Sequence, residues 1–247
     1  MISVRRPAFL PSSSYKREQA AISRRRLYPV TAFYTAYSVI LLAAAARWSA
    51  HPRLAVLFYL AGVPVWSLVE YLTHRYILHG RFKESKHRWK IHKKFAHKVL
   101  DPLHWEHHER PFDGLHINGV LKDLLPLFAV AAPLSFLFPF YTAPLVLAGV
   151  CQGYVTEEWV HHSIHYYNFR SRYWRHIKKY HLYHHTSQGM TRGFGITSAF
   201  WDGIFKTRFP EDTRLRLFGE GRRSDLFPRR AQGVGARKVE AVGARAD

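Results

Sequence analysis

The longest stretch without a charged side chain, residues 124–156, limits most tightly what this chain can fold into. A helix of about 20 apolar residues crosses the hydrocarbon of a bilayer, so the 33 residues of this stretch are long for one span and slightly short for two. Two shorter uncharged runs precede it, residues 27–46 and 54–69. Pro139 and Pro144 favour a turn inside the long stretch. It therefore predicts either one kinked span or a helical hairpin that returns to the side it came from.

The charge distribution predicts how these runs are oriented. The formal net charge is +20, and the basic residues are concentrated in residues 1–26 and 81–98. Cytoplasmic segments of membrane proteins carry the lysines and arginines, so we expect both termini and the segment after the second run on the cytoplasmic side. Beside membrane spans, anionic lipid headgroups are a simpler partner for this charge than a nucleic acid, which we do not expect.

The domain organisation follows from the same pattern. We expect a single membrane-embedded domain at residues 27–218, between disordered polar tails at residues 1–26 and 219–247. The chain has one cysteine, which excludes a disulfide framework and a zinc finger built from cysteines.

Ten of the seventeen histidines form four blocks with regular spacing. On a helix, positions three and four apart share a face, so we expect an H-x-x-H-H triplet to aim three imidazoles at one point, and H-x3-H to aim two. H-x4-H fits a helix face less well and predicts a helix end that unwinds. The blocks are His74 and His79; His104, His107 and His108; His161 and His165; and His181, His184 and His185.

These blocks predict a shared metal site. Imidazole binds iron, zinc, copper and nickel, and a structural zinc site needs about four ligands, so ten imidazoles are too many for one ion and suit two. All four blocks can meet only if residues 124–156 fold back on themselves as a hairpin. We therefore predict an all-α integral membrane protein with four transmembrane helices, the last two a hairpin, and a cytosolic helical cap that holds the metals.

Four sequence stretches carry a resemblance to a known family: "EYLTHRYILH", "LHWEHHERPFDG", "EEWVHHSIHYY" and "YHLYHHTSQGMTRGFGITSAFWDGIF". They resemble the fatty acid hydroxylase / sterol desaturase superfamily of membrane di-metal oxygenases, and within it are most similar to the fatty acid 2-hydroxylases. The resemblance implies that the ten histidines bind two iron ions, that O2 is the co-substrate, and that no catalytic residue is needed beyond the ligands. It also implies that a hydroxyl is inserted into an unactivated C–H bond of a fatty acyl chain or acyl lipid.

The resemblance leaves several points open. The fused cytochrome b5 domain of eukaryotic members has no counterpart in this sequence, so we expect a separate electron donor of the ferredoxin or cytochrome type. Zinc can replace iron in purified samples, because histidine sites accept it readily. A sterol desaturase or a carotenoid hydroxylase is an alternative within the superfamily. A metal-binding or metal-transport membrane protein is an alternative outside it, although the histidines lie at the ends of the apolar runs.

Carboxylates near the blocks are candidates for orienting an imidazole by accepting its second N–H. We select Glu158, Asp101 and Asp113 for this role, and Glu70 raises the same question one turn before His74. The aromatic stretch at residues 192–208 is either ordinary core of the cap or part of a route from the bilayer to the metals. We expect His162 to point away from His161. The histidines expected to be surface or interfacial residues rather than ligands are His87, His92, His97, His116 and His176.

Overall fold

The computed structural model describes residues 11–80 and 101–219, and within them every regular element is a helix. The all-α prediction is therefore confirmed for this part of the chain. The chain divides into two compact units between Phe209 and Pro210, and all ten block histidines belong to the first unit. The elements are α1 (Ser13–Trp48), α2 (Pro52–Leu72), η1 (Thr73–Leu78), α4 (Asp101–Glu109), α5 (Leu121–Ser135), α6 (Ala143–Tyr166), α7 (Arg172–His184), α8 (Phe200–Ile204) and α9 (Glu211–Phe218).

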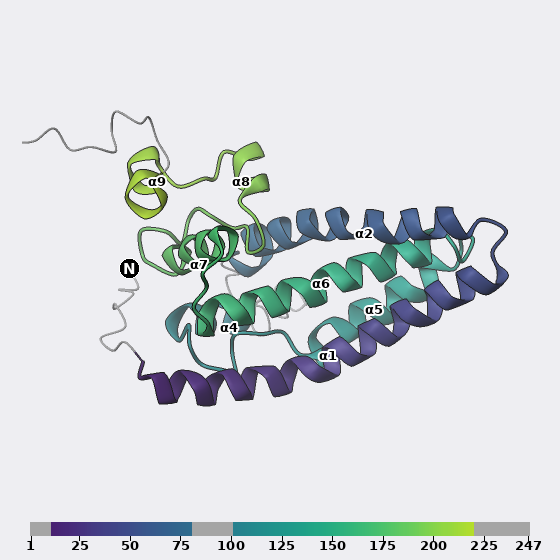
Figure 1. Cartoon of the computed structure of the whole chain (residues 1–247), viewed down its shortest axis with the longest axis horizontal. Coiled ribbons are helices and arrows are strands. Elements are labelled where there is room, and N and C mark those ends of the chain that lie inside the picture. The colour runs from purple at the N-terminus through teal and green to yellow at the C-terminus, as the bar shows by residue number, and fades with distance from the viewer. Residues whose placement is uncertain (1–10, 81–100, 220–247) are drawn as a thin grey trace, which may run out of the picture. The chain divides into compact units, whose positions relative to one another are not determined.

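Helix α6 is the central helix of the first unit and packs against α1, α2 and α5 (Figure 1). Its buried Leu145 and Ala148 contact apolar side chains of α1 and α2. The crossing of α2 and α6 is very close at Gly62 and Gly149, where an added Cβ would overlap backbone atoms of the opposite helix. Only glycine permits such an approach, so these two positions set the distance between the helices that lead to the histidines.

Helix α1 corrects the prediction of a disordered tail, because it begins at Ser13 rather than near residue 27. Ser12 caps it by accepting a hydrogen bond from the backbone N–H of Tyr15 (3.2 Å). Its buried positions recur every three or four residues from the basic part into the apolar part, so one packed face orders both. The buried residues are Ala20, Ser23, Leu27, Val30, Tyr34, Ser38, Leu41 and Ala45.

Two helical stretches in the described residues, Ser13–Trp48 and Pro52–Leu78, are long and apolar enough to cross a membrane. Large apolar side chains on the outside of the helices are strongly exposed, among them Leu57 (62%) and Leu127 (68%). Contiguous exposed apolar surface of this kind marks a protein or membrane contact. Together these features indicate a membrane protein. Four spans are more than the structure shows, since α5 has only 15 residues.

The long uncharged stretch folds back on itself, as the histidine blocks require. Helix α5 ends at Ser135, the chain turns through residues 136–142, and α6 begins at Ala143. Leu124 and Phe128 of α5 pack against a core that contains Tyr154 and Val155 of α6. The two ends of the stretch therefore lie on the same side.

Candidate metal centre

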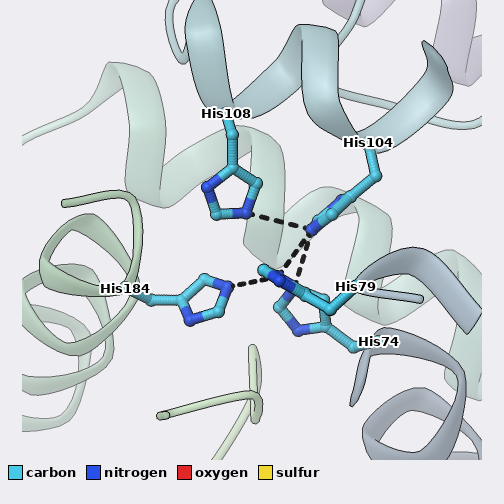
Figure 2. Close-up of side chains that lie close together, drawn as sticks. All are labelled: His74, His79, His104, His108 and His184. Carbon is cyan, nitrogen blue, oxygen red and sulfur yellow. Dashed lines mark hydrogen bonds between the residues drawn. The ribbon is translucent and has the colours of Figure 1, made fainter. Parts of the chain in front are cut away.

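The ten block histidines lie in two groups of five, and the ligand atoms of each group lie within 4.8 Å of one another. We name them cluster A and cluster B. Figure 2 shows how the side chains of cluster A point toward one another from separate elements. Cluster A contains His74, His79, His104, His108 and His184, and cluster B contains His107, His161, His165, His181 and His185.

Each H-x-x-H-H triplet contributes to both clusters, so the prediction that a triplet aims at one point is wrong. On α4, His104 and His108 belong to cluster A and His107 to cluster B. Successive residues of an α-helix are rotated by about 100°, so the fourth position of H-x-x-H-H diverges from the fifth, while the first and fifth positions align. At the end of α7, His181 and His185 belong to cluster B and His184 to cluster A. The two triplets thereby connect the clusters.

The structure contradicts a second prediction, that the helix unwinds at the H-x4-H block of His74 and His79. The helix widens there instead. Residues Thr73–Leu78 form a π-helix, and the backbone N–H of His79 donates to the carbonyl oxygen of His74 (3.0 Å). A π-helix pairs residues five apart, and such turns are frequent at functional sites. The spacing of this block therefore matches the local helix, and both imidazoles enter cluster A.

The nitrogen positions fit a metal ion in each cluster. Neighbouring Nε2 atoms are 2.8–3.2 Å apart in cluster A and 2.9–3.0 Å apart in cluster B. Two imidazole nitrogens about 2.1 Å from one ion, at right angles around it, are about 3.0 Å apart. Five converging acceptors cannot satisfy one another by hydrogen bonds, because a neutral imidazole has one N–H. An ion bound by all five removes this conflict.

Two histidines of cluster A are oriented by backbone carbonyls. His74 donates its Nδ1–H to the carbonyl oxygen of Phe194, and His184 donates to that of Arg192 (2.7 Å). A carbonyl oxygen can only accept, so both imidazoles carry their proton on Nδ1 and direct the lone pair of Nε2 into the cluster. Such partners fix the tautomer and the ring orientation of a metal-binding histidine.

The segment that carries these carbonyls, residues 192–197, is held by two buried carboxylates. Asp202 accepts from the backbone N–H groups of Phe194 (3.0 Å) and Gly195 (2.9 Å). Glu70 accepts from Ile196 N–H (2.7 Å) and from both the N–H (3.1 Å) and the hydroxyl (2.8 Å) of Thr197. Glu70 thus acts on the segment rather than directly on His74. Sequence reasoning missed Asp202. The pattern that could have indicated it is the F-W-D-G stretch that follows Gly193 and Gly195.

Burial keeps the imidazoles of α4 and α7 neutral. Desolvation, followed by repulsion from neighbouring imidazoles, lowers the pKa of His108 to about 2. Desolvation also lowers the pKa of His184 to about 4, against a smaller opposite effect of its backbone hydrogen bonds. The pKa of His104 and that of His181 are lowered well below the usual value for the same leading reason. A neutral imidazole is the form that binds a metal.

The carboxylates selected from the sequence do not contact a cluster imidazole in the described residues. Glu158 accepts from the amide of Asn118 (2.8 Å) and from Gly119 N–H (3.1 Å). Asp113 contacts Arg110 (3.3 Å) and His116 (3.0 Å) in a loop. The side chain of Asp101 lies outside the described residues, as do His87, His92 and His97.

The other two histidines of interest differ in their surroundings. His162 points away from cluster B, as predicted, and its Nδ1 lies 2.7 Å from the hydroxyl of Ser23 on α1. His116 belongs to neither cluster; it lies beside Glu106 (2.6 Å) and lines a cavity next to the clusters.

A cavity of about 280 Å³ borders both clusters. His74 and His104 of cluster A and His107 and His161 of cluster B form part of its wall. Apolar side chains form much of the remainder, and the carboxyl groups of three glutamates interrupt them. The apolar part is lined by Trp66, Ile77, Leu78, Leu115, Ile117, Leu124 and Ile196. The cavity can receive an apolar chain and bring it beside both clusters.

Comparison with known families matches residues 59–207 to the model for the fatty acid hydroxylase family. The match covers α6, α7 and all ten cluster histidines. The dihydroceramide fatty acyl 2-hydroxylase FAH2 of Arabidopsis thaliana is 35% identical over 150 residues, which are 59% of this chain and 58% of that protein. The ceramide very long chain fatty acid hydroxylase SCS7 of Saccharomyces cerevisiae is 34% identical over 162 residues, 65% of this chain and 40% of that protein.

A solved structure shares the fold. The chain described as full-length Scs7p, with only its hydroxylase domain visible, superposes with a TM-score of 0.64 at 29% identity. The superposition covers 75% of this chain and 67% of that one. The chain spans about half the length of the curated relatives that it matches: 58% of FAH2 and 40% of SCS7.

Proposed function

The chain belongs to the fatty acid hydroxylase family, and on that premise we propose that it is an O2-dependent di-iron lipid hydroxylase. Its substrate is a fatty acyl chain or an acyl lipid, hydroxylated at a C–H bond next to the carbonyl group. The observation that carries the proposal is the apolar cavity whose wall includes histidines of both clusters. The relatives named above are fatty acyl and ceramide hydroxylases, which supports this class of substrate.

The ten histidines are the proposed ligands, five for each ion. The cavity lies beside both clusters, so a molecule in it would be next to the ions that these histidines would hold. When bound, two iron ions would supply the redox chemistry for activating O2 and breaking an unactivated C–H bond. The carbonyl oxygens of Phe194 and Arg192 hold two of the imidazoles in the correct tautomer.

The chain itself positions the substrate and excludes water. Trp66, Leu124 and Ile196 surround the space where an acyl chain would lie. Holding a C–H bond beside the metals in a fixed geometry lowers the entropic part of the barrier. The apolar wall also protects a reactive site from water. No acid, base or nucleophile beyond the metal ligands is required in this proposal.

The setting of the enzyme is part of the proposal. We propose four spans, with α5 and α6 as the third and fourth, and with the clusters and both termini on the cytoplasmic side. The exposed apolar residues of α1, α2 and α5 support contact with lipid. Electrons would come from a separate donor of the ferredoxin or cytochrome type.

Expression in a host that makes no hydroxylated lipids tests this function. Mass spectrometry of the total fatty acids should show a new 2-hydroxy acid, and the His184→Ala variant should produce none. A changed sterol or carotenoid in place of a hydroxy acid would move the chain to another branch of the superfamily. Full activity of the His184→Ala variant would refute the assignment of the ligands.

A further inference from the structure

Three buried glutamates line the cavity, and two of them are fully occupied by the protein. Glu70 accepts three hydrogen bonds from residues 196–197. Glu158 accepts from the side chain of Asn118 and from the backbone N–H of Gly119. Both carboxyl groups therefore serve to connect one segment of the chain to another. These hydrogen bonds compensate the burial of both carboxyl groups, so neither needs a ligand as a partner.

Glu157 differs from both. Its side chain is as well buried as the others, with 6% of the residue exposed, and it also lines the cavity. Yet none of the hydrogen bonds and ion pairs among the described residues involves the side chain of Glu157. Those of the two other cavity glutamates, Glu158 and Glu70, are made with other groups. It lies one helical turn before His161 on α6, on the part of the wall that leads to cluster B.

A carboxyl group in an apolar cavity is costly unless it has a hydrogen-bond partner. The oxygens of Glu157 are not among the fully enclosed polar atoms, so they can be reached from the cavity. A metal ion in the clusters is not such a partner, since Glu157 belongs to neither group of converging ligand atoms. Since no described residue pairs with Glu157, its candidate partner is a molecule in the cavity. The apolar wall fits the hydrocarbon part of that molecule, which leaves its polar end for Glu157.

We propose that Glu157 is the positioning residue that hydrogen-bonds the carbonyl-containing head of the acyl substrate. This inference rests on the proposed function and adds a residue to it. A protonated carboxyl group donates to a carbonyl oxygen, and either form accepts from an amide N–H or a hydroxyl. By fixing the head, Glu157 sets how far the chain enters, and therefore which carbon lies beside the metals. A 2-hydroxylase needs such a fixed point, because successive methylene groups are chemically alike.

The nature of the head group follows from the same residue. An acyl amide offers both a carbonyl oxygen and an N–H, whereas a free fatty acid brings a carboxylate next to a second carboxyl group. We therefore expect an N-acyl lipid to be preferred over the free acid of the same chain length.

Two substitutions at Glu157 test the inference in the full-length protein with metals bound. Glu157→Gln keeps a donor and an acceptor, whereas Glu157→Leu has similar size and neither. With an N-acyl sphingoid base as substrate, we expect Glu157→Leu to raise KM about tenfold, the effect of losing one buried hydrogen bond. The product should also spread from the carbon next to the carbonyl to carbons further along the chain. Glu157→Gln should keep a single product, and the exposed Glu109→Leu serves as the matched control.

The outcomes separate the inference from the function on which it rests. If the wild type forms no hydroxylated acyl product, the proposed function fails. If the wild type is active and Glu157→Leu, with unchanged metal content, keeps both the KM and the single product, only the role of Glu157 is refuted. A preference of the wild type for the free acid over the amide would also overturn it. If Glu157→Leu does not fold, a loss of the single product in Glu157→Ala supports the inference and its retention refutes it.

Discussion

His107 and His108 are neighbours on α4, yet their imidazoles enter different clusters. This separation gives a direct test of the two-site arrangement. We expect the wild type to bind two metal ions per chain, and both His107→Ala and His108→Ala to bind about one, with loss of activity in each. Metal analysis of purified protein measures this, and His176→Ala, which lies outside both clusters, is the control. Loss of both ions in each variant would mean that the clusters do not bind independently.

The role of Asp202 can be tested at the same scale. Its side chain is fully buried and accepts from two backbone N–H groups of the segment that orients His74 and His184. Asp202→Ala leaves these two N–H donors unpaired, and we expect each unpaired donor to lower the free energy of unfolding by about 1–3 kcal/mol. We also expect less metal to bind in cluster A. Thermal unfolding in detergent and metal analysis measure the two effects. An unchanged melting temperature would show that the segment is held by other contacts.

The neutral histidines predict how stability depends on pH. Folding lowers the pKa of His108 to about 2 and that of His184 to about 4, below the usual value of 6.5. Below about pH 6.5 the unfolded chain therefore binds protons that the folded chain does not, and stability falls as the pH falls. We expect the metal-free protein to melt at a lower temperature at pH 5.5 than at pH 7.5. A melting temperature that rises on acidification would contradict the buried, neutral clusters.

Sequence reasoning reached part of this residue-level picture. The spacing of the histidine blocks was enough to select the ten residues that the structure brings together, because local helical periodicity controls where they point. It did not divide them between two clusters, since that depends on how α4 and α7 approach each other. Asn118 and Glu70 act through contacts between segments far apart in the chain, which no local pattern records. Asp202 bonds residues only seven and eight positions before it, within the F-W-D-G region that sequence reasoning passed over.

At the scale of elements, the close crossing of α2 and α6 leads to another prediction. An added side chain at Gly62 would overlap the carbonyl oxygen of Val146 and separate the helices. We expect Gly62→Leu to destabilise the protein by about 1–3 kcal/mol, as for other overpacked positions. The adjacent Ala61 is exposed, so Ala61→Leu is the matched control and should have little effect. Equal melting temperatures for the two variants would show that the helices do not pack as described.

The elements also show where the sequence was misread. Basic residues at 16–26 indicated a tail, but Ala20 and Ser23 between them and Leu27 directly after them continue the buried face of α1. The H-x4-H spacing was judged against an α-helix, although it matches the π-helix that forms at Thr73–Leu78. The basic segment was not compared with an amphipathic helix, and the H-x4-H spacing was not compared with a π-helix. The hairpin, in contrast, followed from the requirement that the histidines meet.

At the scale of the whole molecule, the single cysteine allows the proposed topology, with the clusters on the cytoplasmic side, to be tested. Cys151 is buried, so a Cys151→Ser background provides a protein without reactive thiols. In it, we expect Ala50→Cys, between α1 and α2, to react with a membrane-impermeant maleimide in intact cells. Ser14→Cys, at the start of α1, should react only after the cells are opened. Reaction of both in intact cells would contradict a spanning α1.

The central claim, that two clusters of five histidines bind metals that hydroxylate a lipid with O2, is tested most directly by isotope labelling. Cells expressing the wild-type chain would be grown under O2 enriched in heavy oxygen, and their acyl chains analysed by mass spectrometry. The account predicts a 2-hydroxy acyl product whose new hydroxyl carries the heavy isotope, absent from cells that express His107→Ala or His108→Ala. A product whose hydroxyl oxygen comes from water, or one that persists in those variants, would contradict it.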